Sequence, residues 1–116
     1  MFIYGVSQSS GVERRLEIDR SGPGISLGIY DNAGDVARDR IVVRADDLMA
    51  AIISRTEGGS TIEDAAPSSG EKKHLDLEVR RNEVQLKTRA EGAGEWDVAV
   101  GLDDFQDALE GVVSVE

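Results

Sequence analysis

The sequence predicts an α+β fold built from two tandem βββα or ββββα repeats, in which each antiparallel sheet is covered by one helix and a pseudo-two-fold relates the repeats. Two observations support it: the second half of the chain repeats the first, and in both halves apolar residues alternate with polar ones, as in half-buried strands. Four segments return in the same order: Leu16-Glu17-Ile18 as Leu77-Glu78-Val79, Ile25-Ser26-Leu27 as Val84-Gln85-Leu86, Ile41-Val42-Val43 as Val98-Ala99-Val100, and Asp46-Asp47-Leu48 as Asp103-Asp104-Phe105. Their spacing changes only between the matched segments, where loops absorb a change in length.

The first repeat, residues 1–55, begins with a predicted hairpin. Leu16 and Ile18 alternate with acids, and the Ser-Gly-Pro-Gly sequence of residues 21–24 has the composition of a turn before the next alternating run. The short apolar run at residues 2–6 is a candidate for an additional strand in front of the hairpin.

A third strand and a helix complete this repeat. After a polar loop at residues 31–39, the β-branched residues 41–43 suit a strand. Asp46 or Asp47 can accept hydrogen bonds from the free backbone amides of a helix start, and the following apolar spacing predicts a helix that ends near Arg55.

Residues 56–71 are rich in Gly, Ser, Thr and acids, which is typical of a flexible linker. The second repeat, residues 72–116, has the cleaner pattern: an alternating strand, a tight turn at residues 82–83, a returning strand, a third strand at residues 96–100, and a helix that opens at Asp103. A lone three-stranded sheet would leave apolar surface in water, so we expect the two repeats to pack as one domain, residues 1–116.

Composition limits the class of protein. The chain is 40% hydrophobic and 31% charged, as in an ordinary folded protein. No apolar run approaches the roughly 20 residues that a membrane-spanning helix needs, and the first residues lack the pattern of a secretion signal. We therefore expect a soluble cytoplasmic protein without a membrane partner.

The charge is unevenly distributed. The net charge is −10, and after Ala90 the chain has eight acids and no Lys or Arg. Residues 72–89 reverse the balance, with six bases against three acids. The overall charge argues against a general binder of polyanions, whereas the basic segment leaves room for a local anionic contact.

The candidate catalytic residues have simpler structural explanations. His74, the single histidine, lies on an alternating strand beside two lysines, and no Ser-His-Asp arrangement is evident. The acid pairs at residues 46–47 and 103–104 suit helix starts better than metal ligands, and the absence of cysteine removes thiol chemistry. The sequence predicts no enzyme, no cofactor and no metal.

The order of elements resembles a known family. Residues 15–19, residues 25–30, Ala33-Gly34 and residues 40–43 resemble the order of a Pur (purine-rich-element-binding) repeat and of the related Whirly-type folds, and the likeness extends over both halves. The resemblance implies curved sheets that present basic and aromatic side chains to unpaired bases, with a fourth strand in each repeat. It implies the following nucleic-acid-binding residues, which fall on outward strand positions: Tyr30, Arg40, Arg44, Arg80, Lys87 and Arg89.

The sequence therefore predicts a non-enzymatic binding module whose partner is single-stranded DNA or RNA. The alternative is an acidic protein-interaction or regulatory module that binds a basic partner through its C-terminal helix. Pairing of two chains into a homodimer fits either function, since small sheet modules often close their edges in this way.

Overall fold

The computed structural model describes residues 2–22, 24–31, 34, 39–53, 58–63, 73–90 and 94–114. In this part of the chain, four strands and a helix occur twice in the same order. The elements are β1 (Phe2–Val6), β2 (Glu13–Ser21), β3 (Gly24–Asp31), β4 (Asp39–Arg44), α1 (Ala45–Ile53), β5 (Gly58–Glu63), β6 (Lys73–Arg80), β7 (Glu83–Ala90), β8 (Gly94–Gly101) and α2 (Leu102–Ser114).

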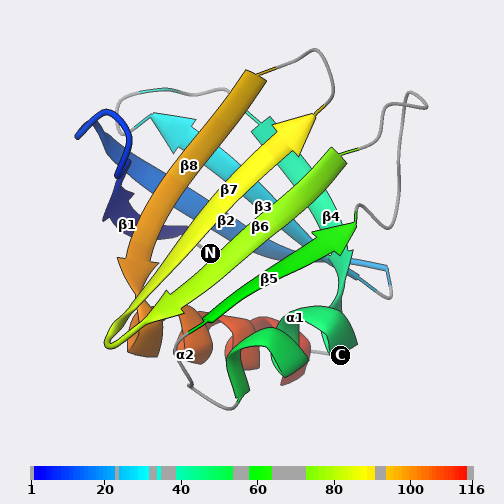
Figure 1. Cartoon of the computed structure of the whole chain (residues 1–116). Helices are drawn as coiled ribbons and strands as arrows, with labels where there is room; N and C mark the ends of the chain where they lie inside the picture. Colours follow the sequence, from blue (N-terminus) through cyan, green and yellow to red (C-terminus); the bar gives the residue numbers. More distant parts are fainter. Residues whose placement is uncertain are drawn as a thin grey trace.

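All eight strands belong to one antiparallel sheet, which curls into a nearly closed barrel (Figure 1). The strand order is β4-β3-β2-β1-β8-β7-β6-β5. The predicted fold class, two sheets each covered by its own helix, is therefore wrong. The two halves merge because β1 pairs with β2 along its whole length and also meets β8 at the pair Val6 and Ala99, which leaves fewer unpaired sheet edges than two separate sheets would.

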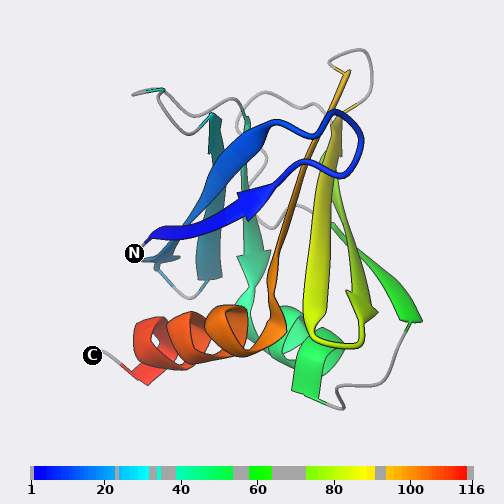
Figure 2. The ribbon, with the colours of Figure 1, turned by 90° about the vertical axis from the view of Figure 1, so that its left-hand side faces the viewer.

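The helices also differ from the prediction. Both lie at the same end of the barrel (Figure 2). The longer helix α2 contacts β1 and β2 of the first half as well as β7 and β8 of the second, whereas α1 contacts β4 and β5. Because the curled sheet covers much of its own apolar face, the helices close one end of the barrel, where Phe105 and Leu109 of α2 are fully buried.

The alternation of the strands correctly indicated which side chains point inward. Leu16 and Ile18 of β2 and their counterparts Leu77 and Val79 of β6 are buried in a single core cluster. This cluster also takes in apolar side chains from both helices. One shared core, rather than one core for each half, therefore stabilises the fold.

The segment expected to be a linker contains a strand. Residues 58–63 form β5, which pairs with β6 and places Ile62 opposite Leu75 in the core. The sequence did not indicate this strand because its Gly and Ser residues give no apolar alternation. A strand at the edge of a sheet needs few apolar residues. The rest of the predicted linker, the predicted helix end at Arg55 and most of the polar loop at residues 31–39 lie outside the described residues.

Candidate functional site

The six residues predicted to bind nucleic acid fall into two separate groups. Tyr30, Arg40 and Arg44 belong to β3 and β4, and Arg80, Lys87 and Arg89 belong to β6 and β7. These strand pairs lie on opposite sides of the barrel, with β6 and β7 in front and β3 and β4 behind in Figure 1. The outward side chains of the two groups therefore do not converge into one groove.

The three cations of the second group each have an acidic neighbour on the same face of the sheet. The ion pairs are Arg80 Nε to Glu78 Oε1 at 3.0 Å, Arg89 Nε to Asp76 Oδ2 at 2.7 Å, and Lys87 Nζ to Glu95 Oε2 at 3.9 Å. A phosphate group would have to compete with these carboxylates, and this lowers the gain from each contact.

The first group is built around a largely buried tyrosine. Tyr30 is 8% exposed, and the Phe2 ring packs against it edge-on with centroids 5.5 Å apart. The Arg15 guanidinium lies 4.6 Å from the Phe2 ring centroid and 5.0 Å from that of Tyr30. Tyr30 is thus packed within the molecule, and Arg15 and Phe2, which sequence reasoning did not select, complete the cluster.

Arg40 joins this cluster through its guanidinium. Its Nη2 donates to Glu17 Oε1 at 2.8 Å and to Tyr30 Oη at 2.9 Å, and its Nη1 donates to Ser26 Oγ at 3.0 Å. Burial alone would lower the pKa of Arg40, but the hydrogen bond to Glu17 and the nearby Tyr30 outweigh burial and raise this pKa. The cation is therefore held in place by its neighbours.

The most exposed aromatic side chain in the described part of the chain lies on β1. Tyr4 is 69% exposed and Phe2 42%, and Val6, two residues further along, is also exposed. These three alternate residues point outward, while Ile3 between them is in the core. A row of exposed apolar side chains on one strand is unusual for a monomeric surface and typical of a contact site.

A groove runs beside β1, where this strand leaves β8. The two strands are joined at Val6 and Ala99, and at Gly5 they approach so closely that an added Cβ would lie 2.1 Å from the Ala99 carbonyl oxygen. Beyond this point β1 diverges from β8 and passes above α2 (Figure 2). We call the resulting surface the β1 groove; it has two adjoining parts that share Tyr4.

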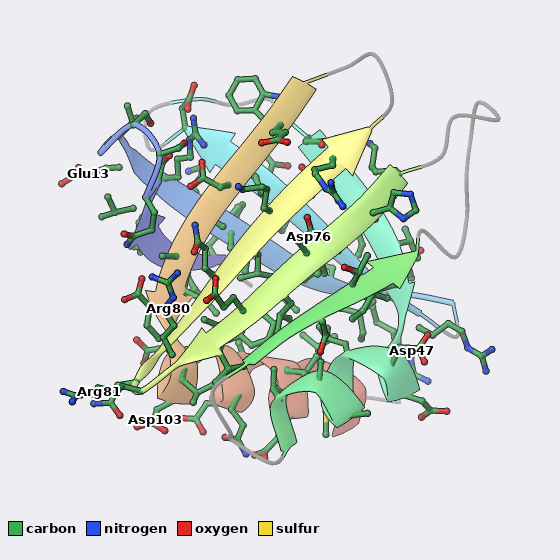
Figure 3. All side chains as sticks on the ribbon, in the orientation of Figure 1. Glu13, Asp47, Asp76, Arg80, Arg81 and Asp103 are labelled. Carbon is green, nitrogen blue, oxygen red and sulfur yellow. The ribbon has the colours of Figure 1, made fainter. Side chains whose placement is uncertain are left out.

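The two parts of the β1 groove differ in charge. The part beside α2, the acidic end, is lined by Phe2, Ile3, Tyr4, Asp104, Asp107 and Ala108. The part beside β8, the arginine end, is lined by Tyr4, Gly5, Val6, Gln8, Arg80, Arg81, Asn82, Glu83, Ala99, Val100 and Gly101. Figure 3 shows the two arginines at the end of β6, close to the start of α2.

The acidic end depends on the start of α2. This helix begins at Leu102, so Asp103 and Asp104 lie in its first turn rather than before it, where their charge favours the helix dipole. The Leu102 amide donates to the Asn82 carbonyl at 2.7 Å, which fixes the helix start against the β6–β7 turn. The same turn and helix therefore position both ends of the groove.

A buried carboxylate holds the other end of β1. Asp97 Oδ1 accepts hydrogen bonds from the hydroxyls of Ser7 and Ser9, both at 2.7 Å, and Arg14 Nη1 lies 3.3 Å away. Burial alone would raise the pKa of Asp97, but the bonds from both serines and the charge of Arg14 lower it overall. This Asp97 clamp fastens the loop after β1 to β8 and fixes the point where the groove begins.

Comparison with models of protein families, with curated proteins and with solved structures found no match. Neither α1 nor α2 is long and apolar enough to cross a membrane. Within the described ranges, no three acidic or histidine side chains come together in a way that could hold a metal ion.

Proposed function

We propose that this chain is a non-enzymatic binding module that takes up a basic, extended segment of a partner protein in the β1 groove. The observation that carries the proposal is the acidic end, where the exposed rings of Phe2 and Tyr4 and the carboxylates of Asp104 and Asp107 line one groove. A Lys or Arg side chain can lay its aliphatic stem on an aromatic ring and direct its charge to a carboxylate.

The distribution of charge over the chain supports a basic partner. The net charge is −10, and no Lys or Arg follows Arg89, so α2 contributes only acidic charge to its surroundings. A basic segment would be attracted to this end of the molecule at long range and then oriented by the groove. Aromatic residues in such a position also contribute strongly to protein interfaces.

Single-stranded nucleic acid is the second candidate partner, and one observation favours it. Arg15, Tyr30, Phe2 and Arg40 bring two rings and two cations together on the outer side of strands β1 to β4. Such a surface could meet a base and a phosphate. It ranks second because both cations are held by groups of the protein and three of the predicted residues, Arg80, Lys87 and Arg89, lie across the barrel.

A titration tests the proposed function. A fluorescent peptide of alternating Lys and Leu with blocked termini should bind the wild-type protein at low salt, with affinity that falls as salt is added. Asp104→Asn with Asp107→Asn should weaken binding roughly tenfold, since two charged contacts are lost. Fluorescence anisotropy measures the affinity of the peptide at each salt concentration and for each variant.

The internal repeat offers a matched control. Asp46→Asn with Asp47→Asn removes the same charge from the start of α1 and should reduce binding far less. Equal losses in the two double variants, or no peptide binding at low salt, would overturn the proposal. Binding of a single-stranded oligonucleotide but not of the peptide would favour the second candidate. The homodimer and the cytoplasmic location stay predictions.

A further inference from the structure

The arginine end of the β1 groove differs in chemistry from the acidic end. The Arg80 side chain is 61% exposed although it pairs with Glu78, and Arg81 is also exposed. Glu83, the acid in the lining of this end, lies opposite Arg80 in the strand register and accepts a hydrogen bond from Gln8 Nε2 at 2.9 Å. The arginine end is thus lined by two exposed guanidinium-bearing side chains and one carboxylate, beside the exposed Tyr4 and Val6.

The backbone at Arg81 points to a role for this side chain. Arg81 has φ of 35°, whereas the corresponding turn of the first half, between β2 and β3, has Gly22 with φ of 56°. A side chain in the left-handed region is disfavoured, and glycine adopts this conformation at no such cost. Unfavourable backbone conformations are concentrated at functional sites, and this one adjoins a groove.

We infer that the β1 groove selects a partner segment with separated charges, in which Lys or Arg occupies the acidic end and Asp or Glu reaches Arg80 and Arg81. This inference rests on the proposed function and adds the second half of the recognition. Tyr4 lines both parts of the groove, so an apolar residue of the segment would lie over it, between the two charged ends.

The length of the segment follows from β1. The groove accompanies this strand from Phe2 to Val6, and an extended chain rises by about 3.3 Å for each residue. A partner segment of roughly five to seven residues therefore spans both ends. A carboxylate at the arginine end would share Arg80 with Glu78, so the gain from this contact is modest.

Two peptides with blocked termini test the inference: Lys-Lys-Leu-Ala-Leu-Glu-Glu and Lys-Lys-Leu-Ala-Leu-Gln-Gln. The peptide that ends in Glu should bind the wild-type protein about threefold more tightly, although the protein is acidic overall. This advantage should disappear in Arg80→Gln with Arg81→Gln. It should persist in Lys87→Gln with Arg89→Gln, which removes the same charge from another part of the same half. Circular dichroism confirms that the variants are folded.

A further variant should increase the preference for the peptide that ends in Glu. Glu78→Gln removes the carboxylate that pairs with Arg80 and should increase the advantage of the peptide that ends in Glu. The inference is overturned if both peptides bind the wild-type protein equally, or if the advantage survives in Arg80→Gln with Arg81→Gln. Either result leaves the proposed function standing as long as the Lys-rich peptides bind. Failure of both peptides to bind would remove the proposed function itself.

Discussion

The strands β1 and β5 occupy the same place in the two halves of the chain but meet different surroundings. Ile3 of β1 pairs with Leu16, and Ser60 of β5 pairs with Leu77, the counterpart of Leu16. Nevertheless β1 lies in the middle of the sheet and joins the halves, whereas β5 forms one edge of the sheet. The repeat thus produced two equivalent strands, and the β1 groove lies where the first of them meets the other half.

The outward side chains of β1 and β5 also differ. The outward positions of β1 carry Phe2 and Tyr4, and the corresponding positions of β5 carry Gly59 and Thr61. The outer surface beside β5 is lined by polar groups together with Leu77. The β1 groove therefore arises from the divergence of the halves rather than from what they share.

A second pair of equivalent positions, Asp97 and Arg40, also makes different contacts in the two halves. Asp97 precedes Val98 on β8 in the same way that Arg40 precedes Ile41 on β4. The Asp97 side chain is 4% exposed and binds the loop after β1, whereas the Arg40 side chain is 44% exposed and binds residues of its own half. The Asp97 side chain therefore joins the two halves, whereas the hydrogen bonds of the Arg40 side chain stay within the first half.

The largest expected effect is loss of the Asp97 clamp. Asp97→Ala should lower the free energy of unfolding by about 3 kcal/mol, because it removes the closer of the two carboxylates that pair with the buried Arg14 and the acceptor of two serine hydroxyls. Arg40→Ala should cost about 1 kcal/mol or less, since the Arg40 side chain is nearly half exposed. Urea denaturation measures the free energy of unfolding of both variants. Equal losses would show that the contacts of Asp97 contribute no more to stability than those of Arg40.

The pH dependence of stability checks the same clamp. Because folding lowers the pKa of Asp97, its ionisation stabilises the folded state fully above the unfolded pKa of about 4 and loses this effect as the pH falls through the lower folded pKa. The wild type should therefore have a higher free energy of unfolding than Asp97→Asn at neutral pH, and this difference should shrink as the pH falls between these two pKa values. A difference that is constant down to low pH would show that the charge of Asp97 does not stabilise the fold.

The next effect concerns the point where β1 meets β8. Gly5→Ala should destabilise the protein by about 2 kcal/mol, because its Cβ would lie 2.1 Å from the Ala99 carbonyl oxygen and 2.8 Å from Val100 Cγ1. Gly59→Ala on β5 should change stability by about 0.5 kcal/mol or less, since the nearest atom would lie 3.9 Å from the added methyl group. Thermal unfolding of the two variants gives the comparison, and a tolerated Gly5→Ala would mean that the strands are not held this closely.

The smallest effect distinguishes the two hairpin turns. Arg81→Gly should raise the free energy of unfolding by about 1 kcal/mol, and Gly22→Ala should lower it by a similar amount, because both positions have positive φ. Chemical denaturation should therefore move the two midpoints in opposite directions. A loss of stability in Arg81→Gly would show that the arginine side chain contributes more to the fold than its backbone conformation costs.

Much of the secondary structure could be predicted from alternation alone. The run from Leu16 to Ile18, its copy at Leu77 and the apolar spacing around Phe105 each indicated the correct element and its buried side. Strand β5 was missed because Gly and Ser carry no such signal. For the groove, the sequence provided two signals: the outward row of Phe2, Tyr4 and Val6, and the acids without bases after Ala90.

The order of apolar and polar residues by itself determined the repeat, the strands with alternating patterns, the inward side chains and the two helices. Only the tertiary structure decided that the two halves share one sheet, that both helices close the same end, and that Arg80 and Asp104 border the same groove. The physical reason is the range of the interactions. Alternation reports the burial of each residue within its own strand, whereas strand order depends on contacts between distant segments such as Val6 with Ala99 and Ser7 with Asp97.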